Sequence, residues 1–145
     1  MQAVIQLVKF EEKYRQRIKA LWQRCGLTVS WNNPDQDIDR KVLNNAETFL
    51  LGLIDDRVIA TVMYGYDGHR GSVYYLGVDP DYQRQGFAKQ IMLEVERRVQ
   101  LLGCPKINLL VRSSNTTVLD FYKNLGYSVD PVVSLGKRFE QDEPF

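Results

Sequence analysis

The stretch Val78–Ala88, VDPDYQRQGFA, decides how this chain is built, because it joins a strand to an amphipathic helix through an unusual turn. Pro80 cannot donate a hydrogen bond to a sheet, so the strand ends near Asp79. We expect the helix that follows to begin around Arg84. Its apolar positions recur at helical spacing and form one stripe: Ile91, Val95, Val99 and Leu102.

The turn has the features of an anion site. The amides of residues 84–88 would be the first unpaired donors of the helix, and they lie at the positive end of its dipole. Gly86 and the small Ala88 let the oxygens of a ligand approach the backbone closely. The stretch therefore suits a phosphate or pyrophosphate. A simple turn glycine among solvent-facing residues is the alternative, and the phosphate motifs GxxxxGKS/T and GxGxxG are both absent.

Outward from this turn, the hydrophobic pattern predicts an α/β fold in a single domain over residues 1–145. The predicted strands are residues 3–10, 48–54, 57–66, 72–79, 106–112 and one or two within 127–139. The predicted helices are residues 11–25, 35–46, 84–102 and 115–126. Asp55 and Asp56 have the composition of a tight hairpin between two of these strands.

Composition excludes several function classes. The 145 residues carry 19 Lys and Arg against 18 Asp and Glu, and a net charge of +1 provides no basic field for nucleic acid. The N-terminus lacks a signal peptide and no apolar run could span a bilayer, so we expect a cytoplasmic protein that does not bind membranes. One histidine and two distant cysteines make a metal site improbable, and we expect none.

Two motifs carry a resemblance to a known family. QRQGFA, residues 83–88, resembles the Gln/Arg-x-x-Gly-x-Gly/Ala signature of the GNAT superfamily of acetyl-CoA-dependent N-acetyltransferases. NTTVLDFYKNLGY, residues 115–127, resembles the second signature of that family, and the two motifs lie on the expected elements. YDGHRGSVYYLGV and SLGKR are also similar to a bacterial branch of the family labelled YpeA.

The resemblance implies a mixed central sheet that splays between its fourth and fifth strands, with helices on both faces. The pantetheine arm of acetyl-CoA would enter this gap and bond to the main chain of Leu76, Gly77 and Val78. The turn would hold the pyrophosphate through a set of six consecutive residues: Gln83, Arg84, Gln85, Gly86, Phe87 and Ala88. Asn115 would cap the later helix and also contact the cofactor.

Tyr122 is the candidate catalytic residue. The resemblance places it where it would protonate the departing CoA thiolate, and a phenol with a pKa near 10 is a suitable acid for a thiol with a pKa near 8.5. Tyr122 also shares a helical stripe with Val118 and Leu125, so a buried core aromatic is the alternative.

The general base is less well defined. Related ribosomal-protein N-terminal acetyltransferases carry a Glu on the fifth strand, whereas this chain has the apolar Leu110. The remaining candidates are Asp67, His69 and Tyr75, acting directly or through water. A histidine in a glycine-rich turn is also explained as a surface residue.

The acceptor side is predicted to contain Trp31 and Asn32 from one loop and Asp67, His69 and Arg70 from a turn. Arg70 would hold a carboxylate, Asp67 would attract an ammonium, and Trp31 would cover the apolar part. Loop packing is the alternative for Trp31.

The sequence thus predicts an enzyme that moves an acetyl group from acetyl-CoA to a primary amine by direct attack through a tetrahedral intermediate. A small-molecule acceptor is favoured over a protein, because a cleft of mixed charge suits a small zwitterionic amine. The alternatives are a protein N-terminal acetyltransferase and a non-catalytic acyl-CoA sensor. We expect a monomer or a homodimer.

Overall fold

The computed structural model describes residues 3–145, and Met1 and Gln2 of the predicted domain lie outside the described residues. Two compact units are present: residues 1–108 with 142–145, and residues 109–141. Each unit is described below by itself. The prediction of a single domain over residues 1–145 stays a prediction.

The first unit is built around a four-stranded sheet in the order β1-β2-β3-β4. Its strands are β1 (Gln6–Lys9), β2 (Phe49–Ile54), β3 (Arg57–Tyr66) and β4 (Gly71–Val78), and every neighbouring pair is antiparallel. The turn between β2 and β3 is tight as predicted, and Asp55 and Asp56 both have the positive φ of a two-residue hairpin.

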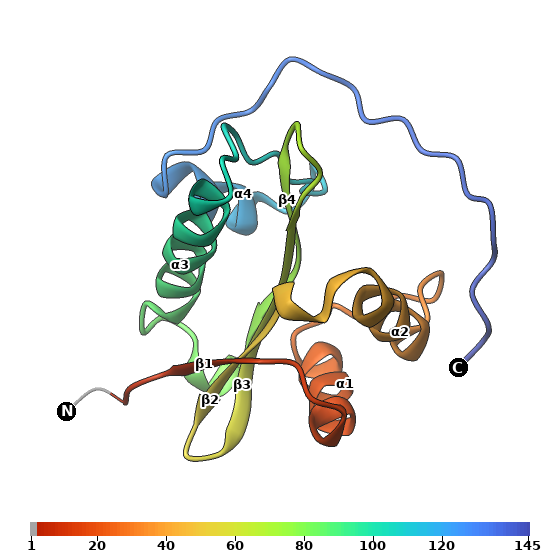
Figure 1. The fold of residues 1–145 in the computed structure, drawn as a ribbon, viewed down its shortest axis with the longest axis vertical. Helices are drawn as coiled ribbons and strands as arrows, with labels where there is room; N and C mark the ends of the chain where they lie inside the picture. Colours follow the sequence, from red (N-terminus) through yellow and green to blue (C-terminus); the bar gives the residue numbers. More distant parts are fainter. Residues whose placement is uncertain (1–2) are drawn as a thin grey trace. The chain divides into compact units, whose positions relative to one another are not determined.

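Helices cover both faces of the sheet, as predicted (Figure 1). On one side lie α1 (Arg15–Arg24), which follows the short 3-10 helix Glu12–Tyr14, and α2 (Pro34–Asn45). On the other side lies α3 (Phe87–Leu101). Short 3-10 turns, Ala46–Thr48 and Pro80–Tyr82, precede β2 and follow β4.

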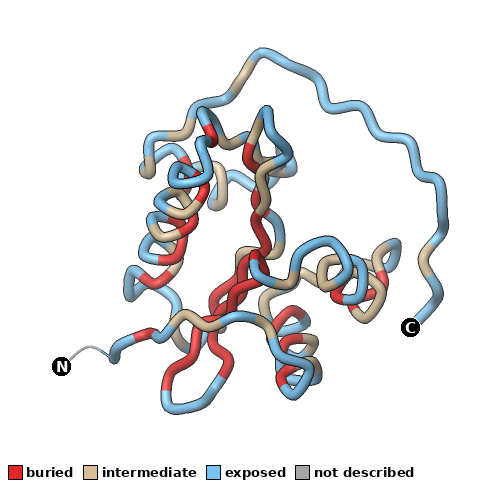
Figure 2. The backbone as a smooth tube through the Cα atoms, in the orientation of Figure 1, coloured by how far each residue is buried: buried red, intermediate tan, exposed pale blue. Residues whose placement is uncertain are grey.

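The core of this unit forms because β2 and β3 are apolar along their whole length. A strand with helices on both faces buries every residue rather than every second one. All six residues of β2 are buried, and so are seven consecutive residues of β3 (Figure 2). On the α1 and α2 side, Trp22, Ile18 and Ile38 pack with Phe49 and Leu51 in one cluster. On the other side, α3 buries its predicted stripe except for Leu102.

Strand prediction was wrong for the two late segments. Of residues 106–112, only Ile107 forms a bridge, parallel to Gly71, and no strand lies within residues 127–139. The described strands are therefore all antiparallel, the bridge at Ile107 adds a parallel pairing at the edge of β4, and the predicted fifth strand is not formed. Apolar composition favours a strand, but a strand forms only where a partner edge continues beside it.

The second unit, residues 109–141, contains α4 (Thr116–Asn124). Asn115 caps this helix, since its side chain accepts a hydrogen bond from the amide of Val118 at 3.3 Å. Gly126 follows the helix in the left-handed conformation, with φ of 95°. Both ends of the predicted helix are thus explained by its sequence.

Candidate active site

The outer edge of β4 is the first component of the site. β4 is the last strand of the sheet, and Gly71 bonds outward: its amide donates to the Lys106 carbonyl and its carbonyl accepts from the Asn108 amide. The register against β3 shifts between Thr61 and Met63, which places a bulge in β4 at Tyr75 and Leu76. Tyr75 has φ of 54°, a left-handed value that is uncommon for a bulky residue.

The bulge determines which main-chain groups face outward. The Asp79 amide donates to the Ile59 carbonyl of β3 at 2.7 Å, so the alternation along the strand turns the main chain of Gly77 toward β3 and those of Leu76 and Val78 toward the outer edge. The carbonyl of Val78 already accepts bonds from the Gln83 side chain, at 2.9 Å, and the Cys25 thiol, at 3.3 Å. Leu76 and the Val78 amide are therefore the groups of the predicted set that suit an added extended chain.

Packing explains why position 77 is a glycine, and the sequence alone did not reveal this reason. A Cβ at this position would lie 2.8 Å from Leu27 Cδ1 and 3.3 Å from Cys25 Sγ. The end of α1 therefore packs directly on β4 at this point. Burial raises the pKa of the Cys25 thiol to about 11, so this cysteine stays protonated and acts as a packing residue.

The start of α3 is the second component, and it differs from the prediction. The helix begins at Phe87 rather than around Arg84, because Arg84 and Gly86 both have left-handed φ values, 63° and 86°. The first intrahelical bond runs from the Gln90 amide to the Gly86 carbonyl, so the amides of residues 87–89 come before it. The first amides of the helix are thus those of residues 86–89, rather than 84–88 as predicted.

The side chains of the turn have different surroundings. Phe87 is buried, so only its main chain is available to a ligand. Gln83 uses its amide group to bond the end of β4, which ties the turn to the strand edge. An added Cβ on Gly86 would meet nothing within 4 Å, so open space lies above this residue. The Gln83 bond ties the turn to the end of β4, so the outer edge of β4 and the N-terminus of α3 are adjacent.

The turn between β3 and β4 is organised by Asp67. Its carboxylate accepts the amide hydrogens of His69 and Arg70, both at 2.8 Å, and these bonds lower the pKa of the Asp67 carboxyl, that of Arg70 most. The Arg70 side chain donates to the His69 carbonyl at 2.9 Å. Asp67 is therefore ionised at neutral pH and first of all a turn residue.

The loop before α2 carries Trp31 and Asn32, and half of Trp31 is exposed. Asn33, the next residue of this loop, caps α2 by accepting the Gln36 amide at 3.2 Å. Its amide donates to the Asp142 carboxylate at 2.8 Å, and its side chain donates to the Glu143 carbonyl. The last residues of the chain thus fix the start of α2.

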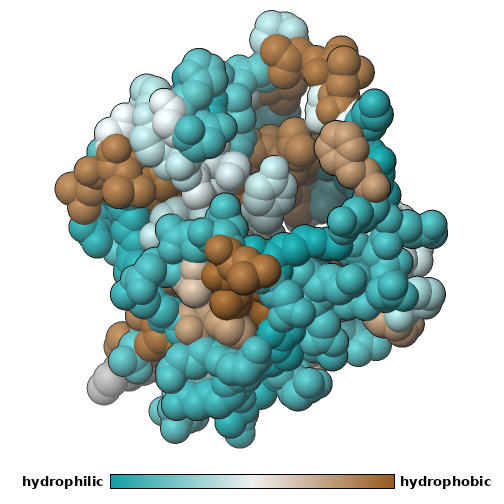
Figure 3. Space-filling view, turned by 45° about the vertical axis from the view of Figure 1, so that its right-hand side comes forward, coloured by the Kyte–Doolittle hydropathy of each residue, from teal (hydrophilic) through white to brown (hydrophobic). Residues whose placement is uncertain are grey.

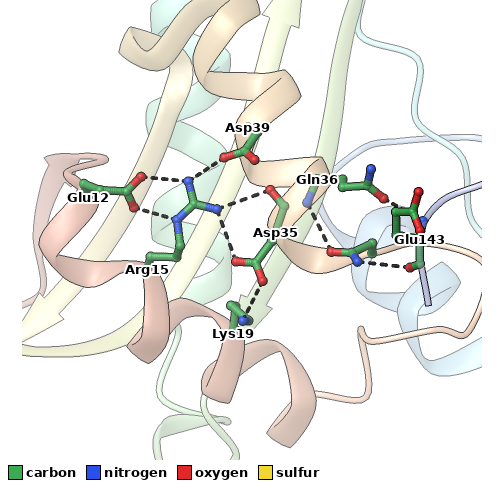
Figure 4. A network of polar contacts seen from close by, with 8 residues as sticks. Glu12, Arg15, Lys19, Asp35, Gln36, Asp39 and Glu143 are labelled. Carbon is green, nitrogen blue, oxygen red and sulfur yellow. Dashed lines mark hydrogen bonds and ion pairs between the residues drawn. The ribbon is translucent and has the colours of Figure 1, made fainter. Parts of the chain in front are cut away.

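A second set of polar contacts joins α1 to α2 (Figure 4). Arg15 is the centre of this set: it donates to Glu12, to Asp35 and to Asp39, the last at 2.6 Å. Lys19 adds an ion pair with Asp35 at 2.7 Å. The position of α2 is therefore fixed both by its contacts with α1 and by the contacts at its N-terminus. No local sequence motif predicts these long-range pairs.

Tyr122 belongs to the second unit. It is buried, and its ring lies edge-on to those of Phe121 and Tyr127, at 5.0 and 5.5 Å. Burial raises the pKa of Tyr122 to about 12. The hydroxyl therefore keeps its proton throughout the neutral range, as an acid must.

The described residues contain neither a cluster of metal-binding side chains nor a membrane-spanning helix. Across residues 3–145, no group of three or more His, Cys, Asp or Glu side chains could hold a metal ion. Within the same residues, no helix has both the length and the apolar character needed to cross a bilayer.

Comparison with known proteins adds sequence and fold evidence. The sequence model of the Acetyltransferase (GNAT) family matches residues 8–127. A protein named acetyltransferase from Yersinia pestis (strain Pestoides F) is 40% identical over 136 residues, which cover 94% of this chain and 96% of the relative. An acetyltransferase from Yersinia enterocolitica is 39% identical over the same coverage.

Solved structures share the fold at low identity. The Escherichia coli ribosomal-protein-S18-alanine N-acetyltransferase matches with a TM-score of 0.71 and 19% identity, over 85% of this chain and 77% of that one. The aminoglycoside N-acetyltransferase AAC(6')-Iy in complex with CoA matches with a TM-score of 0.72 and 16% identity, over 96% and 97%. The predicted fold class is confirmed by these matches.

Proposed function

The chain belongs to the GNAT family of acetyltransferases, and from this premise we propose that it moves an acetyl group from acetyl-CoA to the primary amine of a small molecule. The observation that carries the proposal is the outer edge of β4 beside the N-terminus of α3. One element offers main-chain groups to an extended chain, and the other offers amides to an anion. Coenzyme A has both an extended amide-bearing arm and a pyrophosphate.

The residues present fit the cofactor. Leu76 and Val78 would bond the pantetheine amides by adding a strand-like segment to the sheet. Gly86 and the amides of residues 87–89 would hold the pyrophosphate, with Gln83, Arg84 and Gln85 around it. Open space at Gly86 allows the anion to approach. Acetyl-CoA supplies the activated acetyl group, and this chain supplies binding and proton transfer.

Tyr122 is proposed as the acid that protonates the CoA thiolate, and Asn115 as a second contact to the cofactor. The hydroxyl of Tyr122 is buried and protonated, which supports the proposed role of this residue as an acid. The family model runs from residue 8 to 127 and so extends from the first unit into the second, which supports one acetyltransferase domain over residues 1–145. We propose a cytoplasmic monomer or homodimer.

A small acceptor is favoured over a protein N-terminus for two reasons. Leu110 occupies the position where the sequence comparison with N-terminal acetyltransferases expects a glutamate. The fold neighbours also include an aminoglycoside acetyltransferase that covers almost the whole chain. Trp31, Asn32, Asp67, His69, Arg70 and Tyr75 are the proposed acceptor residues.

The test measures CoA release from acetyl-CoA with a panel of amino-acid-like amines, aminoglycosides and short peptides. Turnover of small amines supports the proposal, while turnover of peptides alone indicates an N-terminal acetyltransferase. CoA binding without turnover of any acceptor indicates a sensor. Arg70→Ala should raise KM for carboxylate-bearing amines, and Arg57→Ala in the other hairpin should not.

A further inference from the structure

One hydrogen-bonded pair beside the bulge of β4 is not explained by cofactor binding. The Tyr75 hydroxyl donates to Asp37 Oδ2 at 2.5 Å, a short bond of the kind that a charged acceptor makes. Asp37 lies on α2, and 21% of its side chain is exposed. The pair therefore joins a partly buried carboxylate to a phenol that immediately precedes Leu76 of the proposed cofactor edge.

The conformation of Tyr75 is held by several independent contacts. Its carbonyl accepts from Thr61 Oγ1 at 2.8 Å, and Thr61 Oγ1 accepts from Trp22 Nε1 at 2.9 Å. The Tyr75 ring also stacks on Trp22, with centroids 3.9 Å apart. A left-handed φ at a bulky residue is costly and persists only where the surroundings fix it, a situation found mainly at functional sites.

Two further charged groups adjoin the pair. Asp37 faces Arg40 at 3.4 Å, and Arg40 pairs with Asp142 at 2.7 Å, so these two charged groups adjoin the pair. Burial, then the bond and charge of Asp37, raise the pKa of the Tyr75 hydroxyl above its ordinary range. The Tyr75 hydroxyl therefore keeps its proton at neutral pH.

The direction of the cofactor places the reacting end near Tyr75. In the proposed binding mode, the pyrophosphate lies at residues 86–89 and the arm runs back along β4 from Val78 to Leu76. The acetyl group at the end of that arm then comes to the bulge. An amine that attacks it has to lose a proton at this place.

Building on the proposed function, we propose that Tyr75 and Asp37 together remove the proton from the acceptor ammonium. An N–H proton of the ammonium moves to the Tyr75 oxygen while the Tyr75 hydroxyl proton moves to Asp37. The products of this step are a neutral amine, a neutral tyrosine and a carboxylic acid, which returns its proton to water after the acetylated product leaves. Tyr75 is the catalytic residue, and Asp37 acts through it.

The test compares Asp37→Asn and Tyr75→Phe with Asp39→Asn. Asp39 is a matched control, because it lies on the same helix and its carboxylate bonds to Arg15 instead. Tyr75→Phe keeps the ring that stacks on Trp22, so it serves if Asp37→Asn fails to fold. The measurements are kcat/KM for the fastest amine of the panel from about pH 7 to about pH 10, and CoA affinity by calorimetry.

We expect Asp37→Asn and Tyr75→Phe to lose roughly 10²-fold in kcat/KM near pH 7, the usual contribution of a positioned base. The loss should shrink toward about pH 10, where an alkyl amine deprotonates in water by itself. CoA affinity and the Asp39→Asn profile should match wild type. If the pair were purely structural, the two substitutions would lower kcat/KM by the same factor at every pH.

If the pH profiles of kcat/KM for Asp37→Asn and Tyr75→Phe run parallel to that of wild type, or coincide with it, this inference is overturned. The proposed function is then unaffected. An absence of turnover by wild type with every amine overturns both, and the CoA titration then shows whether cofactor binding itself fails. Recovery of the variants at high pH, with wild-type CoA affinity, supports the inference.

Discussion

At the scale of single residues, Tyr122 is the position where burial has the clearest chemical consequence. A pKa raised to about 12 means that the phenol keeps its proton throughout the neutral range. A group that stays protonated is available as an acid in every turnover. Its surroundings are aromatic, so removing the hydroxyl alone leaves the packing of Phe121 and Tyr127 unchanged.

Tyr122→Phe should therefore keep CoA affinity and lower kcat by roughly 10²–10⁴, the usual contribution of a positioned acid. Tyr127→Phe is the matched control, since it removes the same atom from the neighbouring ring of the same aromatic group. Steady-state kinetics and calorimetry check both. A loss of about tenfold or less would indicate that solvent protonates the thiolate and that Tyr122 is mainly a packing residue.

At the scale of elements, α3 contains a local ion-pair group that links its stability to pH. Glu94 bonds Arg97 at 2.6 Å and Arg98 at 2.9 Å, and these two bonds, Arg97 first, lower the pKa of the Glu94 carboxyl to about 2. Because the folded pKa is below the unfolded one, the stabilisation is complete above about pH 4.5. It is lost as pH falls from there to about 2.

Glu94→Gln should therefore cost about 1 kcal/mol or less of unfolding free energy at neutral pH, the range of partly exposed pairs. The difference from wild type should vanish near pH 2. Denaturant unfolding of wild type and Glu94→Gln at several pH values measures this difference. A difference that is constant from neutral to acid pH would show that the ion pairs contribute nothing.

The elements also show what a sequence can predict. The stripe of α3, the hairpin at Asp55 and Asp56, and the cap at Asn115 are set by neighbours in the chain, and each was predicted. The absence of a strand at residues 106–112 and the start of α3 at Phe87 were not predicted, because both depend on backbone conformation and pairing that composition does not encode. The bulge at Tyr75 and its bond to Asp37 join residues 38 positions apart, beyond any local pattern.

At the scale of the whole molecule, the face drawn in Figure 3 is mainly hydrophilic, with separate hydrophobic groups among the polar ones. Several large hydrophobic residues are exposed in the C-terminal part of the second unit: Val129, Val132, Val133, Leu135 and Phe139. The first unit also exposes apolar side chains, Leu43 and Leu101 among them, but it buries those of β2 and β3 on both faces of one sheet. Its well-packed sheet and α3 therefore carry the proposed cofactor site.

The two ends of α3 offer a matched pair of glycines for testing the proposed cofactor site. Gly86 and Gly103 both have left-handed φ values, 86° and 90°, and an added Cβ meets nothing within 4 Å at either position. Valine at each should therefore cost a similar amount of stability, on the order of 1–2 kcal/mol. Only Gly86 lies at the N-terminus of the helix, where the pyrophosphate is proposed to bind.

The decisive measurement is CoA affinity by calorimetry for wild type, Gly86→Val and Gly103→Val, alongside unfolding of each. We predict that Gly86→Val weakens CoA binding by at least about tenfold, or 1.4 kcal/mol, while Gly103→Val binds as wild type does. A Gly86→Val protein that is folded and binds CoA as tightly as wild type would contradict the proposed cofactor site.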